Sequence, residues 1–426
     1  MDDWNDSSAS RRRLTLGFLT AIYTVGFLDR QILSILQEPI KRDLQLTDSH
    51  LALLTGTTFA LFYVFAGVPL GRLVDRTKRT RVIAVCLALW SATTALCGAA
   101  QQFWQLTLCR MGVGIGEGGC NPAAHSMISD LYPPARRSGA LAIYGSGVNL
   151  GILIGFMAGG LLVEKLSWRW ALILAGLTGL VLALAFQRMI PEPARAASRD
   201  TPSARNQNVS VKDIARLFWS DRALLQLMVA MAFIGVATYG ITMWSASIMI
   251  RSYGASIREA GVWLAISIGI GGIVGTMVTG FLADGQASKG PCACLKVTAA
   301  TSALLCVGLL LAFTATEKQT AFLWLLLPGT LSAVHVGPSV TAAYNLVPAT
   351  ARGTTSALAV LVTNLAGLGI GPLMLGVLSD HLSPSLGHNS LRQAFLYVAP
   401  ACALCAALLY YLASRREPSE AAKRTR

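Results

Sequence analysis

Long apolar runs, separated by short polar stretches, dominate the chain. A helix needs about 20 mostly apolar residues to cross a bilayer. Twelve runs meet this requirement and predict an all-α membrane protein. The predicted transmembrane helices lie at about 14–37, 50–71, 81–100, 104–129, 138–163, 169–189, 222–250, 258–282, 294–315, 320–346, 354–378 and 391–413.

The composition and charge support lipid surroundings. Charged residues make up 13% of the chain and hydrophobic residues 54%, whereas a soluble domain carries about 25% charged residues. The net charge of +14 does not indicate nucleic-acid binding, because the basic residues lie near predicted helix ends and no basic recognition motif occurs. With both termini in the cytoplasm, cytoplasmic segments hold 24 of the 35 Lys and Arg residues and outer loops hold 8, as the positive-inside rule requires.

One short pattern occurs twice, 209 residues apart: Gly71 to Asp75 and Gly280 to Asp284 each place a glycine four residues before an aspartate. A repeat of this kind predicts two like halves that rock against each other during transport. The predicted division is a cytoplasmic tail at 1–13, a six-helix bundle at 14–190, a cytoplasmic linker at 191–216, a second bundle at 217–413 and a tail at 414–426.

The stretch from Gly71 to Arg81 resembles the signature loop of the major facilitator superfamily, Gly-x-x-x-Asp-Arg-x-x-Arg, although Lys78 replaces the usual second glycine. The resemblance implies twelve helices in two pseudo-symmetric six-helix bundles and a loop that latches the halves together on the cytoplasmic side. The implied gate residues are Gly71, Asp75, Arg76, Arg79, Gly280 and Asp284.

Glycines recur every four residues in the fifth predicted helix, at Gly147, Gly151, Gly155 and Gly159. This spacing places them on one stripe, where small residues let two helices pack closely in lipid. We expect a packing surface, with a hinge or sliding role as the alternative.

Ionisable residues interrupt two of the predicted helices: Asp29 and Arg30 in the first, Arg110 and Glu117 in the fourth. A charge at the bilayer centre costs at least ~2.5–3.5 kcal/mol, so it normally has a partner or a function. Arg110, Glu117 and the polar Asn121 fall within about 40° of one another on a helix, and such a stripe can line a cavity.

Glu117 and Asp29 are the proton-coupling candidates, because desolvation and a neighbouring arginine act in opposite directions on the proton affinity of a carboxyl group. The alternative is a static ion pair, Asp29 with Arg110 or Glu117 with Arg30. Either arginine is also a candidate partner for an anionic head group. Further substrate-binding candidates are the polar residues within predicted helices, namely Asn121, Tyr239, His335, Asn149 and Asn364. His125 is expected to lie too far toward the cytoplasm to reach a central site.

Three stretches, Phe27 to Leu33, Arg110 to Cys120 and Asp130 to Arg137, resemble bacterial members of the Spinster family, relatives of sphingosine-1-phosphate and lysophospholipid transporters. The resemblance implies that Asp29, Arg30 and Glu117 act at a central cavity and that the membrane is the bacterial inner membrane. Because the second half offers a mostly apolar lining, we expect an amphipathic substrate, such as a lysolipid or a sphingoid-like molecule.

Other functions have less support from the sequence. No nucleotide-binding loop, metal-ligand set or nucleophile–base pair is evident, which predicts no cofactor, no metal and no enzymatic activity. The alternatives are a proton-coupled carrier of small organic anions or drugs and a non-transporting membrane sensor. We expect a monomer whose partners are its substrate, protons and membrane lipids.

Overall fold

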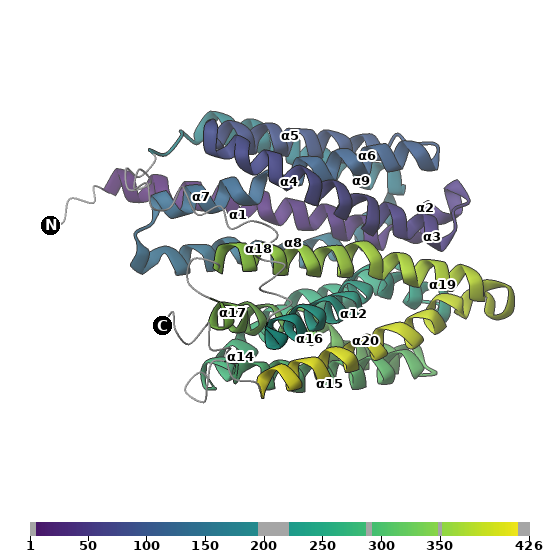
Figure 1. The fold of residues 1–426 in the computed structure, drawn as a ribbon. Coiled ribbons are helices and arrows are strands. Elements are labelled where there is room, and N and C mark those ends of the chain that lie inside the picture. Colours follow the sequence, from purple (N-terminus) through teal and green to yellow (C-terminus); the bar gives the residue numbers. More distant parts are fainter. Residues whose placement is uncertain (1–5, 195–220, 287–291, 348–351, 416–426) are drawn as a thin grey trace. The chain divides into compact units, whose positions relative to one another are not determined.

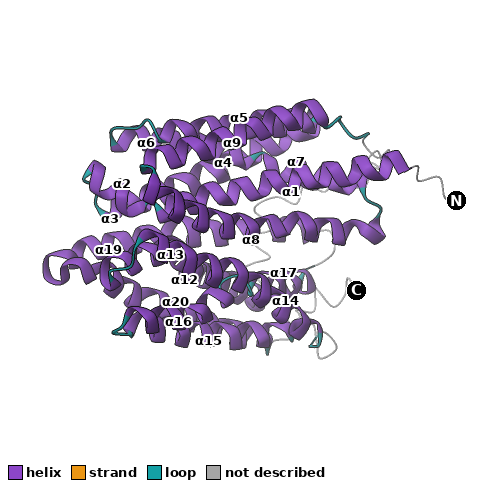
Figure 2. Ribbon diagram, turned by 180° about the vertical axis from the view of Figure 1, so that it is seen from behind, coloured by secondary structure: helices purple, strands orange, loops and turns teal. Residues whose placement is uncertain are grey.

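The computed structural model describes residues 6–194, 221–286, 292–347 and 352–415, which are helical almost throughout and contain no strand (Figures 1 and 2). The first half comprises α1 (Asp6–Ile35), α2 (Gln37–Leu44), α3 (Asp48–Ala52), the π-helical η1 (Leu53–Thr57), α4 (Thr58–Arg76), α5 (Arg79–Cys97), α6 (Phe103–Gly118), α7 (Cys120–Leu131), α8 (Pro134–Lys165) and α9 (Trp168–Met189). The second comprises α12 (Arg222–Tyr253), α13 (Ile257–Leu264), the π-helical η3 (Ala265–Ile270), α14 (Gly271–Asp284), α15 (Cys294–Thr314), α16 (Lys318–Leu331), α17 (Val336–Leu346), α18 (Arg352–Thr363), the π-helical η6 (Asn364–Ile370), α19 (Gly371–Leu386), the 3-10 turn η7 (Gly387–Asn389) and α20 (Ser390–Ser414).

The predicted all-α membrane class is confirmed, and each of the twelve predicted segments is helical over most of its length. Within the described ranges, nine helices are long and apolar enough to cross a membrane, or ten when the bent pair α1–α2 counts as one span. Two segments explain the difference from twelve. The α6–α7 segment is interrupted at Gly119, and the run Leu358–Ser414 holds two predicted helices joined by a turn at Gly387, where φ is 53°.

The chain forms two compact units. Unit 1 takes the described residues of Met1–Leu46, Leu53–Ala197 and Ile257–Ala265; unit 2 takes those of Thr47–Ala52, Ser198–Ser256 and Ile266–Arg426. Two short segments are therefore separated from their chain neighbours: Thr47–Ala52 belongs to unit 2 and Ile257–Ala265 to unit 1. Most of the predicted linker at 191–216 and of the tail at 414–426 lies outside the described residues.

The glycine stripe of α8 is the packing surface that its spacing predicts. In unit 1, α8 packs along α1, and a Cβ added at Gly151 would lie 2.4 Å from the Thr24 carbonyl oxygen. The glycines of α6 act similarly, since a Cβ at Gly114 would lie 2.8 Å from the Phe59 carbonyl oxygen. The backbone of a neighbouring helix, rather than a solute, fills the space that these glycines leave.

The predicted loop after the second transmembrane helix is wrong in extent. Helix α4 continues to Arg76 and α5 begins at Arg79, so only two residues separate them. The helix extends because both the backbone N–H and the hydroxyl of Thr77 donate to the Leu73 carbonyl oxygen, at 3.0 and 2.7 Å.

The gate glycines do not mark a close helix approach. Among the described residues, nothing lies within 4 Å of a Cβ added at Gly71 or Gly280. Asp75 and Arg76 are exposed near the end of α4. Asp284 ends α14, and its side chain lies outside the described part of the structure.

Candidate functional site

A cavity lies inside unit 1, among α1, α5, α6, α7 and α8. It is small in this conformation, with about 20 Å³ of room for the centres of water-sized molecules within about 290 Å³ of space not filled by protein atoms, open solvent included. Its wall combines one ion pair with several aromatic rings. The lining side chains include Tyr23, Phe27, Arg30, Trp90, Glu117, Asn121 and Tyr144.

The break between α6 and α7 places two of these side chains on the wall. Helix α6 ends at Gly118 and α7 starts at Cys120, so Glu117 stands in the last turn of one helix and Asn121 in the first turn of the next. Glycine is required at the break, because a Cβ at Gly119 would lie 2.7 Å from the Cys86 sulfur.

Arg30 and Glu117 form an ion pair on the cavity wall. The Arg30 Nε donates to Glu117 Oε2 at 3.0 Å, and Nη2 donates to the same oxygen. The guanidinium also lies over the rings of Phe27 and Phe59, 4.7 and 4.5 Å from their centroids. Glu117 is 6% exposed, and its other oxygen, Oε1, has no hydrogen-bond partner among the described residues.

Asp29 and Arg110 are buried outside this wall. Asp29 Oδ2 accepts a hydrogen bond from the Thr94 hydroxyl at 3.3 Å, whereas Oδ1 has no partner among the described residues. Arg110 donates from Nε to the Leu54 carbonyl oxygen at 3.0 Å and lies over the Phe59 ring. Arg110 is therefore not among the residues that line the same cavity as Glu117, because its long side chain extends toward η1.

A polar network orients the aromatic part of the wall. The Tyr144 hydroxyl donates to Asn121 Oδ1 at 2.5 Å, and Asn121 Nδ2 donates to the Tyr63 hydroxyl at 3.2 Å. Tyr144 also stacks on Tyr23, with ring centroids 4.5 Å apart, and meets the edge of His125. Tyr63, Tyr144 and Trp90 were not predicted as site residues, since nothing in the local sequence pattern distinguishes them from ordinary core aromatics.

The remaining substrate-binding candidates are not among the residues that line this cavity. In unit 2, the Tyr239 hydroxyl of α12 donates to Asn364 Oδ1 of η6 at 2.9 Å. His335 is 4% exposed, and its Nδ1 has no partner among the described residues. Asn149 is half-buried on α8 in unit 1 and is not part of the cavity wall.

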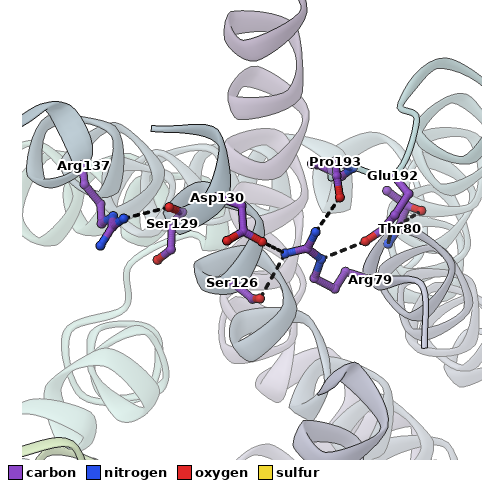
Figure 3. Close-up of polar contacts among 8 residues, drawn as sticks. All are labelled: Arg79, Thr80, Ser126, Ser129, Asp130, Arg137, Glu192 and Pro193. Atoms are coloured by element: carbon purple, nitrogen blue, oxygen red, sulfur yellow. Dashed lines mark hydrogen bonds and ion pairs between the residues drawn. The ribbon is translucent and has the colours of Figure 1, made fainter. Parts of the chain in front are cut away.

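A second buried arginine, Arg79, joins three segments of unit 1 where α5 begins (Figure 3). Its guanidinium pairs with Asp130 at the end of α7 and with Glu192 after α9, the latter at 2.8 Å. It also donates to the Ser126 hydroxyl at 3.2 Å and to the Pro193 carbonyl oxygen at 2.7 Å. Arg79 is fully buried, and these contacts lie within one unit, a role that the gate motif did not predict.

Glu192 is held in its charged form by this cluster. One of its oxygens accepts hydrogen bonds from both the backbone N–H and the hydroxyl of Thr80, each at 2.9 Å. Burial alone would raise the pKa of Glu192, but the hydrogen bonds from Thr80 and Arg79 outweigh burial and lower that pKa below its ordinary value.

In the described ranges, no group of three His, Cys, Asp or Glu side chains is arranged to hold a metal ion.

Comparison with known proteins finds one matching family and several similar transporters. The family model described as Major Facilitator Superfamily matches residues 19–369. An MFS-type efflux pump of Mycolicibacterium smegmatis is 32% identical, over 97% of this chain and 95% of the pump. The sphingosine-1-phosphate transporter SPNS2 of Danio rerio is 24% identical, over 91% of this chain and 80% of that protein. The crystal structure of a bacterial homologue of the human lysosomal transporter Spinster, inward-facing and unoccupied, matches with a TM-score of 0.80 at 26% identity, over 95% of this chain and 97% of that one.

Proposed function

Since the chain belongs to the Major Facilitator Superfamily, we propose that it is a proton-coupled secondary transporter of an amphipathic, lipid-like substrate. Its relatives are transporters, not enzymes. The substrate is a lysolipid or a sphingoid-like molecule, and transport proceeds by alternating access across the bacterial inner membrane. The protein acts as a monomer with both termini in the cytoplasm.

One observation carries the proposal: Glu117 lines the cavity with one carboxylate oxygen bonded to Arg30, and its other oxygen has no hydrogen-bond partner in the part of the chain that the structure describes. Buried polar atoms are nearly always hydrogen-bonded, so an unpaired carboxylate oxygen beside a cavity is a place where a proton or a ligand is expected. In this arrangement Glu117 is the first proton-binding group.

The ion pair supplies the coupling. When Glu117 takes up a proton, its charge is lost and its attraction for Arg30 weakens. The Arg30 guanidinium then has more of its charge available for an anionic head group in the cavity. Asp29 precedes Arg30 in the chain and is buried, and its Oδ1 has no hydrogen-bond partner within the described ranges. It is the second proton-binding group, and Arg110 is its charge partner.

The substrate class follows from the chemistry of the wall. Aromatic rings such as Phe27 and Tyr144 offer apolar surface to a hydrocarbon chain, while Arg30 and Glu117 meet a polar head. SPNS2 is named as a sphingosine-1-phosphate transporter, which supports a lipid-like substrate. In unit 2, Tyr239, Asn364 and His335, and in unit 1 Asn149, are the further substrate contacts of this proposal.

A second candidate is a proton-coupled carrier of small organic anions or drugs. The observation in its favour is the name of the mycobacterial relative, an efflux pump. The two candidates predict different preferences, because an apolar wall binds a molecule without a long apolar part only weakly.

The test is uptake of a labelled panel into proteoliposomes that contain the purified protein. The panel pairs lysolipids and sphingoid amines with small organic anions, and each is measured with and without an imposed pH gradient. We expect lysolipid or sphingoid flux that the gradient increases and that Glu117→Gln makes insensitive to the gradient. Preference for the small anions would overturn the lipid assignment, and a gradient effect that survives Glu117→Gln would overturn the coupling role.

A further inference from the structure

Four cysteines of unit 1 form two pairs along one side of α5. The thiol of Cys97 is hydrogen-bonded to that of Cys109 on α6, and the thiol of Cys86 to that of Cys120 on α7. The step from Cys86 to Cys97 along α5 equals the step from Cys109 to Cys120 along the antiparallel α6–α7 segment. The two pairs therefore belong to one packing register and lie at opposite ends of the same contact.

A glycine sets the distance between α5 and α6 beside the Cys97–Cys109 pair. A Cβ added at Gly112 would lie 2.5 Å from the Thr93 Cγ2 atom. Thr93 stands one helical turn before Cys97, and Gly112 stands one turn after Cys109. A disulfide joins cysteines whose Cα atoms are about 4.4–6.8 Å apart, and close packing of the two helices favours such an approach.

The Cys97–Cys109 pair lies near the end of both helices. Cys97 is the last residue of α5, and α6 begins at Phe103 after a short connection. Cys109 is half-buried, whereas Cys97 is 2% exposed. With both termini in the cytoplasm, as proposed above, this end of the helices is the outer one, where the surroundings of a bacterial cell oxidise thiols. A small oxidant therefore meets Cys109 first and Cys97 second.

The other pair has the same register but a different environment. Cys86 and Cys120 are both buried, and the Cys120 thiol donates to the Ile83 carbonyl oxygen at 3.9 Å. Neither thiol of this pair has the exposure of Cys109, although Cys120 contributes to the cavity wall. Cys86 and Cys120 are therefore a control within the same molecule, and we expect them to stay reduced.

We propose that Cys97 and Cys109 are a reversible oxidation site, which hydrogen peroxide converts into an intramolecular disulfide. The sulfur of Cys109 attacks one peroxide oxygen, the O–O bond breaks, and the other oxygen leaves as water with the thiol proton. The sulfur of Cys97 then attacks the sulfenic acid on Cys109, the S–O bond breaks, and the hydroxyl leaves as a second water with the Cys97 proton. The two cysteines together lose two electrons, which reduce the peroxide.

The second cysteine keeps the oxidation reversible. A sulfenic acid without a neighbouring thiol is oxidised further to sulfinic acid, which ordinary thiols do not reduce. A disulfide returns to two thiols by exchange with another thiol. Cys97 is the resolving residue of this pair, because its hydrogen bond holds it against Cys109.

The test exposes the full-length protein in proteoliposomes to hydrogen peroxide. The remaining thiols are then alkylated in denaturant, and the cysteine peptides are identified by mass spectrometry. We expect one pair of peptides joined through Cys97 and Cys109, two hydrogen atoms lighter than the separate peptides, which dithiothreitol separates. Cys86 and Cys120 should both be alkylated.

Two variants separate the roles of the cysteines. In Cys97→Ser, the same treatment should leave Cys109 as sulfinic or sulfonic acid that dithiothreitol does not restore. Cys86→Ser, which removes one member of the control pair, should form the Cys97–Cys109 disulfide as the wild type does.

The wild-type protein alone decides the proposal, whether or not the variants fold. Sulfinic acid on Cys109 without a link to Cys97 would overturn it, and so would two thiols that stay reduced while peroxide oxidises other cysteines of the chain. The readout is the chemical state of the sulfur atoms, so either failure would leave the proposed transport function untouched.

Discussion

Two buried arginines of unit 1, Arg79 and Arg30, are paired with carboxylates in contrasting ways. Arg79 is fully enclosed, and its donors are distributed over two carboxylates, a hydroxyl and a carbonyl oxygen. Arg30 donates to Glu117 Oε2 and lies over aromatic rings beside a cavity. Its partner Glu117 keeps one oxygen without a hydrogen bond from any described residue, so we expect this pair, unlike that of Arg79, to allow a change in protonation.

We expect this difference to separate an arginine that stabilises the fold from one that acts in transport. A buried network in which every polar group has a hydrogen-bond partner is rigid. Removing one member leaves the other groups buried without a partner, so the cost of their desolvation is no longer offset. A partly satisfied pair beside a cavity has a lower cost of rearrangement, because water, a proton or a ligand can take the place of the lost contact. The following predictions test whether stability resides at Arg79 and transport at Arg30 and Glu117.

The largest effect on stability is expected from Arg79→Gln. The substitution leaves Asp130 and Glu192 without their cationic partner, and breaking a buried pair in this way costs about 3–5 kcal/mol. The measurement is thermal unfolding of the purified protein in detergent. Arg76→Gln, at an exposed position in the same motif, should leave the unfolding temperature nearly unchanged, and equal shifts for the two variants would contradict the structural role.

A smaller, pH-dependent effect is expected at Glu192. Its pKa in the folded protein is lower than its ordinary value of 4.5, so its ionised form stabilises the fold. This contribution is complete above pH 4.5 and is lost as the pH falls below 4.5 through the lower folded pKa. Unfolding midpoints measured from neutral pH to pH 3 should therefore show the wild type above Glu192→Gln at neutral pH, with the gap closing in acid; a constant gap would contradict this assignment.

The smallest effect is expected from Tyr144→Phe on the cavity wall. The change removes the hydrogen bond to Asn121 and leaves the ring stacked on Tyr23, so about 1 kcal/mol of interaction is lost. We expect weaker apparent substrate affinity, roughly fivefold in KM by that free energy, with a similar maximal rate. Tyr397→Phe, at an exposed position on α20 in unit 2, is the control; a KM unchanged by Tyr144→Phe would show that the network does not shape the site.

The helices and their packing glycines were predictable because their causes are local. A run of apolar residues predicts a membrane helix wherever it occurs, and a four-residue glycine period predicts a close contact such as that of Gly151 with Thr24. The repeat of the pattern at Gly71 and Gly280 likewise predicts two like halves.

The contacts of the site were only partly predictable, because they join distant parts of the chain. Arg30 with Glu117 was one of two pairings that the sequence allowed, and the structure contains that one. Helical angles placed Arg110 beside Glu117, yet its flexible side chain bonds to Leu54 instead. Nothing in a single sequence relates Arg79 to Glu192, which follows α9.

The role of Glu117 as the coupling group can be tested by comparing two modes of transport in one variant. Exchange of labelled for unlabelled substrate across proteoliposomes needs no net proton movement, whereas uptake driven by a pH gradient does. We predict that Glu117→Gln retains exchange and loses the response to the gradient. If uptake by the variant still rises with the imposed gradient as steeply as uptake by the wild type, Glu117 is not the coupling group.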